Sequence, residues 1–435
     1  MQPGQGRPGW ASSTIAAHSR RSRVTAAATL AAVAGLAAAF TLQAIPARAA
    51  VIIRPGAARG SARPAVTSGS LRAWGFNRFG ALGTGNTAAH FLPVRVRLPA
   101  GTKVTVVRST CDHTLAVTRT GSVLAWGLNR HGGLGNGSTR NSRTPVRVAL
   151  PRGMKVSAVR AGCDFSLALT STGRVLAWGD GEDGDLGDGS TTQRLRPVLV
   201  KLPAGVKVKA ISVGDNTALA LTTNGDVLAW GEGTDGQLGN GAVSNRQLPV
   251  RVKLPARAKA SAIAAGSGTG FAVTSAGTFA WGVNNDGQLG VGDTTSRKVP
   301  ARIVVPAGVQ SAGKISQLAA GSGQTYALTA KGKVLAWGDN PFGELGNNTD
   351  ISSMVPVRVM LPPGTRATSV SASEVSGFAL TASGHVLAWG GGLLGNGTQS
   401  DSFVPVQVML ASSLRATAIG SGPESNSVFA IVSPR

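Results

Sequence analysis

The sequence predicts an all-β protein: a seven-bladed β-propeller of four-stranded antiparallel blades. Its seven Trp-Gly pairs begin at Trp74, Trp126, Trp178, Trp230, Trp281, Trp337 and Trp389. The intervals between them are 52, 52, 52, 51, 56 and 52 residues. A fixed period of this length, with one bulky aromatic per period, is typical of solenoids and propellers. Each period also carries four short stretches of β character, the number of strands in a propeller blade.

One period shows how the four strands are predicted. Residues 103–108, 114–118 and 145–150 alternate apolar and polar side chains, the pattern of half-buried strands. Residues 123–126 are almost continuously apolar, as expected for a strand buried on both sides. Gly121 lies between the second and third stretches and suits a tight hairpin. The repeat is therefore a four-stranded antiparallel meander.

Other residues recur at fixed distances from the tryptophan. A Gly-x-Leu-Gly segment follows it, and a proline comes 19 residues after six of the seven tryptophans. We expect this proline to head the fourth strand at the outer edge, where a missing N–H is tolerated. The tryptophan is expected to pack between blades, with a ligand-stacking platform as the alternative.

The two ends of the repeat region complement each other. The first repeat begins near residue 67 and lacks the two strands that should precede its hairpin. Residues 416–420 and 428–432 have the pattern of those missing strands. We therefore expect the N- and C-terminal strands to share one blade and to close the ring at seven.

The first 65 residues differ from the repeats. Residues 1–49 contain Arg20, Arg21 and Arg23, an alanine-rich apolar run and an Ala-Arg-Ala cleavage site, which predicts a secretory signal peptide. The alternative is an uncleaved membrane anchor. Residues 50–65 resemble a flexible basic linker, and the propeller is assigned to 66–435. A secreted or extracellular location follows, with association with the envelope also open.

These motifs resemble one known family. Gly-x-Val-x-x-Trp-Gly followed by Gly-x-Leu-Gly, repeated seven times from about residue 66 to 435, resembles the regulator of chromosome condensation repeat family. The resemblance implies a seven-bladed propeller and, by analogy, an exchange-factor-like regulator of a small GTPase. The family's exchange factor uses an inserted hairpin, whereas the longest interval here exceeds the usual 52 residues by four. The family's typical histidine after the first strand survives only as His113.

The meander predicts where a binding site would lie. The turn between strands one and two and the long loop between strands three and four must emerge on the same face. Exposed aromatics beside arginines are typical of protein-binding patches. The candidate partner-binding residues on this face are Phe76, Arg78, Phe79, His113, Arg130, His131 and Phe342. The alternative is that they are ordinary loop residues.

No enzyme, cofactor or metal site is predicted. The five histidines show no metal-ligand spacing, and no nucleophile motif is present. The acidic loop at residues 180–188 could hold calcium but lacks the EF-hand spacing, and it occupies the ordinary Gly-x-Leu-Gly turn. Cys111 and Cys163 occupy equivalent positions 52 residues apart, so a disulfide and two free thiols both remain open.

The formal net charge is +24, and about +19 would remain after loss of the signal peptide. Arginines and lysines recur on the predicted outer strand, which suits anionic envelope polymers. Nucleic acid is not favoured, because aromatic residues do not alternate with these basic ones. The leading hypothesis is an exported, non-catalytic, monomeric protein-binding propeller, an inhibitor or scaffold for a secreted or envelope protein whose identity the sequence does not give. The alternatives are a basic propeller held electrostatically on the envelope and the exchange-factor-like regulator.

Overall fold

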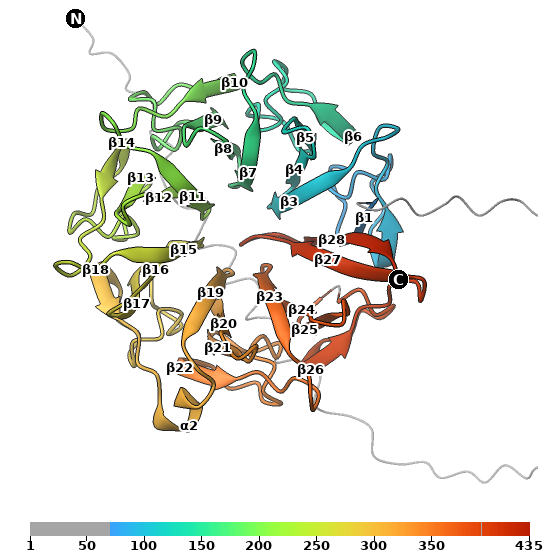
Figure 1. Ribbon diagram of the computed structural model, residues 1–435, viewed down its shortest axis with the longest axis vertical. Helices are drawn as coiled ribbons and strands as arrows, with labels where there is room; N and C mark the ends of the chain where they lie inside the picture. Colours follow the sequence, from blue (N-terminus) through green and yellow to red (C-terminus); the bar gives the residue numbers. More distant parts are fainter. Residues whose placement is uncertain (1–69, 393) are drawn as a thin grey trace, which may run out of the picture. The chain divides into compact units, whose positions relative to one another are not determined.

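The computed structural model describes residues 70–392 and 394–435, and this part of the chain forms seven four-stranded antiparallel sheets arranged as blades around one axis (Figure 1). The predicted fold class is confirmed. The segments assigned to the signal peptide and the linker, 1–49 and 50–65, lie outside the described residues, so these assignments stay predictions.

The blades are numbered here along the chain, starting from the blade that contains both ends. Blade 1 is β1 (Ser70–Gly75), β2 (His90–Arg95), β27 (Leu414–Gly420) and β28 (Ser427–Pro434). Blade 2 is β3 (Val104–Thr110), β4 (His113–Thr118), β5 (Val123–Gly127) and β6 (Ser142–Arg147). Blade 3 is β7 (Val156–Ala161), β8 (Phe165–Thr170), β9 (Val175–Gly179) and β10 (Arg194–Leu199). Blade 4 is β11 (Val208–Val213), β12 (Thr217–Thr222), β13 (Val227–Gly231) and β14 (Arg246–Arg251).

The remaining blades follow the same plan. Blade 5 is β15 (Ala260–Gly266), β16 (Thr269–Thr274), β17 (Gly277–Gly282) and β18 (Arg297–Arg302). Blade 6 is β19 (Ile315–Ala320), β20 (Gln324–Thr329), β21 (Val334–Gly338) and β22 (Ser353–Arg358). Blade 7 is β23 (Ala367–Ala372), β24 (Ser376–Thr381), β25 (Val386–Gly390) and β26 (Ser402–Gln407). The short helix α2 (Ala307–Gln310) precedes blade 6 and accounts for the longest interval between tryptophans.

Blade 1 closes the ring, as the sequence predicts. Its strand order is β2-β1-β28-β27, so the N-terminal pair of strands and the C-terminal pair form one sheet (Figure 1). The register joins Ser70 to Val432 and Gly75 to Ser427 without interruption. Closure leaves no blade interface open to solvent.

The tryptophan of each repeat packs at a blade interface. All seven are fully buried, which excludes the ligand-stacking alternative. Trp230 Nε1 donates to Asp185 O of the preceding blade, and five other tryptophans make the equivalent bond: Trp126 to Ala81, Trp178 to Gly133, Trp281 to Gln237, Trp337 to Gln288 and Trp389 to Glu344. Each acceptor is the variable residue of Gly-x-Leu-Gly, so this motif joins one blade to the next.

Two glycines around Trp230 show why the motifs are constant. Gly187, at the end of Gly-x-Leu-Gly, has φ +60°, and a Cβ there would lie 2.8 Å from Trp230 Nε1. Gly231 has φ +93°, and its Cβ would lie 2.3 Å from the carbonyl oxygen of Asn216. Only glycine fits both the backbone conformation and the space.

The position of the proline differs from the prediction. Pro145 was expected to head the fourth strand of blade 2, at 145–150, but β6 covers Ser142–Arg147 and contains Pro145 in its interior. The fourth strand is an edge strand paired on one side only, so an interior proline there does not have to break a hydrogen-bond ladder.

Candidate protein-binding face

One face of the propeller is formed by the seven turns between the first and second strands and the seven loops between the third and fourth strands. Main-chain bonds join turn and loop within a blade, for example Leu128 N to Asp112 O and Asp180 N to Asp164 O. Eighteen of the 19 acidic residues lie in these segments, five in the turns and 13 in the loops, and the exception is Asp226. We call this surface the acidic face.

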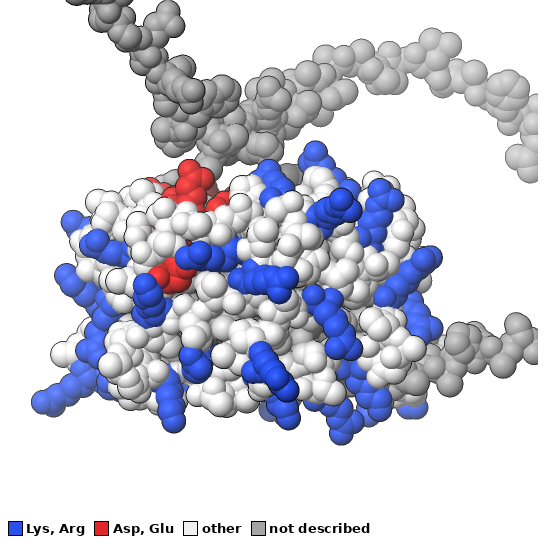
Figure 2. All heavy atoms as spheres, turned by 90° about the horizontal axis from the view of Figure 1, so that it is seen from above, with Lys and Arg blue, Asp and Glu red and all other residues white. Residues whose placement is uncertain are grey.

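Basic residues have the opposite distribution. Residues 70–435 contain 35 lysines and arginines, and only three of them, Arg78, Arg130 and Arg140, lie in the turns and loops of the acidic face. Figure 2 shows acidic side chains gathered toward one edge of the visible surface, with lysines and arginines over much of the rest. A strongly basic chain therefore presents one face of opposite charge.

The acidic face has two halves. The loops of blades 1 and 2 contain its three arginines and no acidic residue. The loops of blades 3 to 6 contain 12 acidic residues and no lysine or arginine. Sequence reasoning identified the first half from its aromatic and basic residues. Of the second half it named only Phe342 as a partner-binding candidate and the loop at residues 180–188 as a possible calcium site. The missed signal was readable, because the acids of blades 3 to 6 follow the same predicted strand in each of these four repeats.

The predicted aromatic residues lie in loops of this face. Phe76 is 53% exposed and Phe342 is 41% exposed, in the loops of blades 1 and 6. Phe79 is partly buried beneath Arg78, whose guanidinium carbon lies 5.1 Å from the ring centroid. Two large apolar side chains and one cation–π pair are thus available on the acidic face.

The side chains of the predicted residues Arg130 and His131 contact acids of the next blade. Arg130 Nη2 lies 2.8 Å from Asp164 Oδ2, and His131 Nδ1 lies 2.8 Å from Asp180 Oδ2. Both pairs connect the loop of blade 2 to blade 3. Hydrogen bonding to Asp164 and its charge raise the pKa of Arg130, so this side chain stays positively charged.

His113 is not on the surface. It is buried on β4, and its Nε2 lies 2.9 Å from Ser166 Oγ on β8 of the next blade. Ser166 Oγ in turn donates to Gly133 O. Burial lowers the pKa of His113 to about 4, so the imidazole is neutral at physiological pH. His113 therefore fastens two blades together and does not lie where a partner could contact it.

Cys111 and Cys163 form a disulfide between blades 2 and 3. Their Cα atoms are 5.1 Å apart, within the range that a disulfide requires. Cys111 begins the turn after the first strand of blade 2, and Cys163 lies within the equivalent turn of blade 3. The bridge therefore fixes two neighbouring turns of the acidic face.

The centre of the face is covered by one turn. Residues 421–426 of blade 1 form the longest of the seven turns. Glu424 Oε1 accepts hydrogen bonds from Ser267 Oγ at 2.6 Å and Ser322 Oγ at 2.8 Å, in blades 5 and 6. Asp215 of blade 4 lies beside them, with its Oδ1 3.2 Å from Ser267 Oγ. The turn of blade 1 therefore reaches across the axis.

Burial, followed by the charge of neighbouring acids, raises the pKa of several acids on this face. Burial, and then the charge of Glu424, raise the pKa of Asp215 well above its usual value. Burial and the charge of Asp183 raise the pKa of Glu232, while burial raises the pKa of Glu344 to about 7. A positively charged group placed beside these acids would favour their charged form. Within the described ranges, no group of three or more His, Cys, Asp or Glu side chains is placed to hold a metal ion.

Comparison with known proteins agrees with this architecture. The RCC1-like domain matches residues 113–426, and the regulator of chromosome condensation (RCC1) repeat matches residues 68–117. The chain belongs to the RCC1-like domain family. Similar proteins include the ultraviolet-B receptor UVR8 of Arabidopsis thaliana, 32% identical over 350 residues, which cover 80% of this chain and 78% of UVR8. Human E3 ubiquitin-protein ligase HERC2 is 32% identical over 290 residues, 66% of this chain but only 6% of HERC2.

Two solved structures share the fold. Human WBSCR16 superposes with a TM-score of 0.73 at 24% identity, over 84% of this chain and all of that one. Prp20p of Saccharomyces cerevisiae gives a TM-score of 0.73 at 23% identity, over 85% of this chain and 93% of Prp20p. Prp20p binds Gsp1p and histones. Among the described residues of this RCC1-like protein, no helix has the length and apolar character needed to cross a membrane.

Proposed function

We propose that this protein is an exported, non-catalytic protein-binding propeller that docks a basic segment of its partner on the acidic face. The observation that carries the proposal is the segregation of charge: 18 of 19 acids lie in the turns and loops of one face of a chain with a net charge of +24. Opposite charge on a partner would steer association and fix its orientation.

The aromatic residues favour a protein over a simple cation as the ligand. Phe76 and Phe342 expose apolar surface next to charged loops. Large aromatic side chains contribute much of the binding energy at protein interfaces, and surrounding polar groups form the rim. A docked partner would cover the two phenylalanines and place its basic residues over blades 3 to 6.

The proposal also includes export from the cell and a role as an inhibitor or a scaffold. The signal-like pattern of residues 1–49 and the Cys111–Cys163 disulfide both suit an oxidising compartment. In that location, a non-catalytic binding propeller would act as an inhibitor of, or a scaffold for, a secreted or envelope protein. Other RCC1-like propellers bind proteins, as Prp20p does.

A second candidate function is attachment to an anionic envelope. It is favoured by the 32 lysines and arginines of residues 70–435 that lie outside the acidic-face segments. Such attachment would use the remaining surface and would weaken strongly with added salt. The exchange-factor-like alternative rests on family membership alone.

The test is a pull-down with the purified protein from culture supernatant and envelope fractions, eluted in steps of increasing salt. One variant removes acids of blades 3 and 4: Glu182→Gln, Glu232→Gln and Asp235→Asn. A second variant carries Phe76→Ala and Phe342→Ala. The matched control removes three exposed lysines that precede first strands, through Lys103→Gln, Lys155→Gln and Lys207→Gln.

We expect wild type and the lysine variant to retain the same discrete protein, and both acidic-face variants to lose it. Loss in the lysine variant alone, with elution at modest salt, would favour envelope attachment. Retention of the same protein by both acidic-face variants would exclude this face as the docking site.

A further inference from the structure

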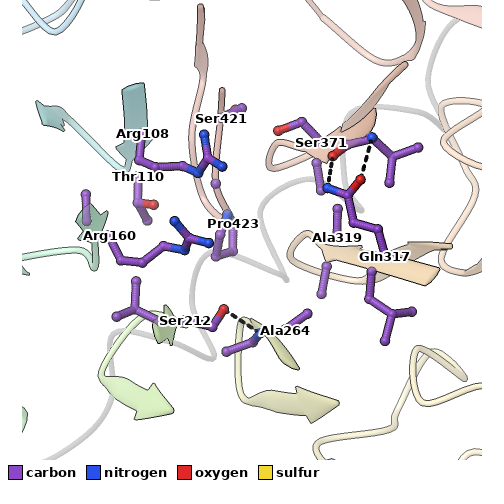
Figure 3. A pocket seen from close by; sticks show the side chains of 18 of the residues that line it. Arg108, Thr110, Arg160, Ser212, Ala264, Gln317, Ala319, Ser371, Ser421 and Pro423 are labelled. Atoms are coloured by element: carbon purple, nitrogen blue, oxygen red, sulfur yellow. Dashed lines mark hydrogen bonds between the residues drawn. The ribbon is translucent and has the colours of Figure 1, made fainter. Parts of the chain in front are cut away.

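The axis of the propeller contains a cavity of about 100 Å³ lined by the first strands of the blades. A site of roughly 10–15 Å³ on this scale accommodates one water molecule, so the cavity has room for a small polyatomic ligand. Two of its lining residues are cationic: Arg108 of β3 and Arg160 of β7. Figure 3 shows both guanidinium groups pointing toward the axis, near Pro423.

The two arginines have no anionic partner among the described residues. Arg108 Nη1 donates to Val107 O at 2.7 Å, and Arg160 Nη1 donates to Val159 O at 2.9 Å. These are main-chain acceptors, and neither arginine takes part in an ion pair within residues 70–392 and 394–435. A guanidinium group has five N–H donors, so most donors of each arginine have no acceptor within the described part of the chain.

Burial disfavours the charged forms of Arg108 and Arg160. Burial lowers the pKa of Arg160 to about 9, with the charge of Arg108 as the second cause. Burial also lowers the pKa of Arg108. Both groups nevertheless stay charged at neutral pH. Two like charges at the edge of one cavity are stabilised when an anion lies between them.

Hydroxyl groups complete the lining. Ser212 Oγ accepts a hydrogen bond from Ala265 N at 3.0 Å, which leaves its own hydrogen free to donate. Thr110 and Ser421 also line the cavity. The two central acids of the acidic face, Glu424 and Asp215, are not part of this lining.

The lining of the axial cavity continues toward the opposite face. A second cavity of about 350 Å³ shares Arg108, Ser369 and Ile419 with the first. It extends to Thr105 and Thr368, near the beginnings of β3 and β23, and so toward the face away from the covering turn. Lysines and arginines are abundant outside the acidic face, so an anion approaching from that side meets favourable charge.

We propose that this axial cavity is a binding site for a small oxyanion, held between Arg108 and Arg160. Planar guanidinium groups bind phosphate, sulfate and carboxylate oxygens through paired N–H donors. The site lies beneath the turn 421–426 of the acidic face, but none of the acids and phenylalanines proposed to dock the protein partner line it, so it does not depend on that partner.

The test is isothermal titration of the purified protein with inorganic phosphate at constant ionic strength, with chloride as the compensating ion. Sulfate and acetate, titrated in the same way, distinguish a preference for tetrahedral anions from one for carboxylates. The variants are Arg108→Gln and Arg160→Gln, together with Arg108→Lys, which keeps the charge but loses the paired donors. The matched control is Arg174→Gln, an exposed arginine in a hairpin outside the cavity.

We expect saturable binding of one anion per chain, weakened about tenfold or more by each cavity substitution and unchanged by Arg174→Gln. Circular dichroism of each variant checks that it is folded, and Arg108→Lys guards against an effect of charge removal on folding. No saturable binding of any of the three anions, or equal binding by wild type and all variants, would overturn the proposal.

Discussion

The indole nitrogen of Trp230 lies 2.9 Å from the main-chain oxygen of Asp185, and this hydrogen bond fastens blade 4 to blade 3. Trp230 also belongs to an apolar cluster that contains Phe165 and Leu186 of blade 3. The interface therefore combines burial of a large side chain with one directed polar contact, and the two contributions can be separated by substitution.

Trp230→Phe is expected to lower the free energy of unfolding by about 1–3 kcal/mol, because it leaves the Asp185 carbonyl without its donor. Trp230→Ala is expected to cost about 3–5 kcal/mol, because it also opens a cavity. Urea unfolding followed by circular dichroism measures both. Equal losses for the two variants would mean that the hydrogen bond dominates and that packing contributes little.

The side chain of Asp185 is expected to destabilise the same interface at neutral pH. Its Oδ1 is buried and lacks a hydrogen-bond partner among the described residues. Burial, followed by the charges of Asp183 and Asp180, raises its pKa well above the usual value. The folded state therefore binds this proton more tightly than the unfolded state, and the chain loses stability as pH rises from the ordinary carboxyl pKa through the raised one.

Asp185→Asn should accordingly stabilise the protein by more than about 1 kcal/mol at pH 7 and by much less near pH 4. Asp185→Gln should act similarly, since Gln237 and Gln288 hold the equivalent position and accept from Asp235 N and Asp286 N. Thermal unfolding at both pH values measures the effect, with the exposed Asp235→Asn as control. A variant as stable as wild type at pH 7 would contradict the buried-charge argument.

The fold could be predicted because its determinants are local and repeated. Each period carries its own strands, its tryptophan and the glycines that the interface requires. The same pattern therefore occurs seven times, and each copy supports the strand assignment of the others. The acceptor of the tryptophan N–H was not predicted, because Asp185 lies 45 residues before Trp230 and meets it only in the assembled ring.

The candidate site was predicted less completely, because several of its contacts also form only in the assembled ring. The predicted four-stranded repeat placed Phe76 and Phe342 in loops, and both side chains are exposed. His113 has the same loop-like context in sequence, but its burial depends on Ser166 in the next blade. Arg108 stands at a polar position of a strand, and only closure of the ring determines that this side faces a central cavity.

His113 should make the free energy of unfolding fall as the pH becomes mildly acidic. Burial lowers its pKa from the ordinary 6.5 to about 4. The unfolded state therefore binds more protons between these values, so stability is lost as pH falls from about 6.5 to 4. The full contribution is about 3 kcal/mol.

His113→Gln should remove this part of the pH dependence, because glutamine keeps a polar group near Ser166 without gaining a proton. Chemical denaturation at several pH values between 4 and 7 measures the slope for wild type and variant. The matched control is His385→Gln, the same substitution at a histidine in the hairpin between β24 and β25 of blade 7. An unchanged slope in His113→Gln would assign the acid sensitivity to other groups.

The Cys111–Cys163 disulfide should stabilise the junction of blades 2 and 3. The two residues are 52 positions apart, and a cross-link closing a loop of that length lowers the entropy of the unfolded chain by the equivalent of about 4 kcal/mol. Replacement of both cysteines by serine, or reduction of the wild-type protein, is expected to lower the free energy of unfolding by up to that amount. Reductant should have no effect on the double variant.

The pairing itself is checked by denaturing the protein with an alkylating reagent and without reductant, followed by peptide mapping. The expected product is one pair of peptides that contains Cys111 and Cys163 and separates only after reduction. Alkylation of both thiols in protein isolated from an oxidising medium would contradict the disulfide. The contacts His113–Ser166, Arg130–Asp164 and His131–Asp180 would then be among the polar contacts that hold this side of the acidic face together.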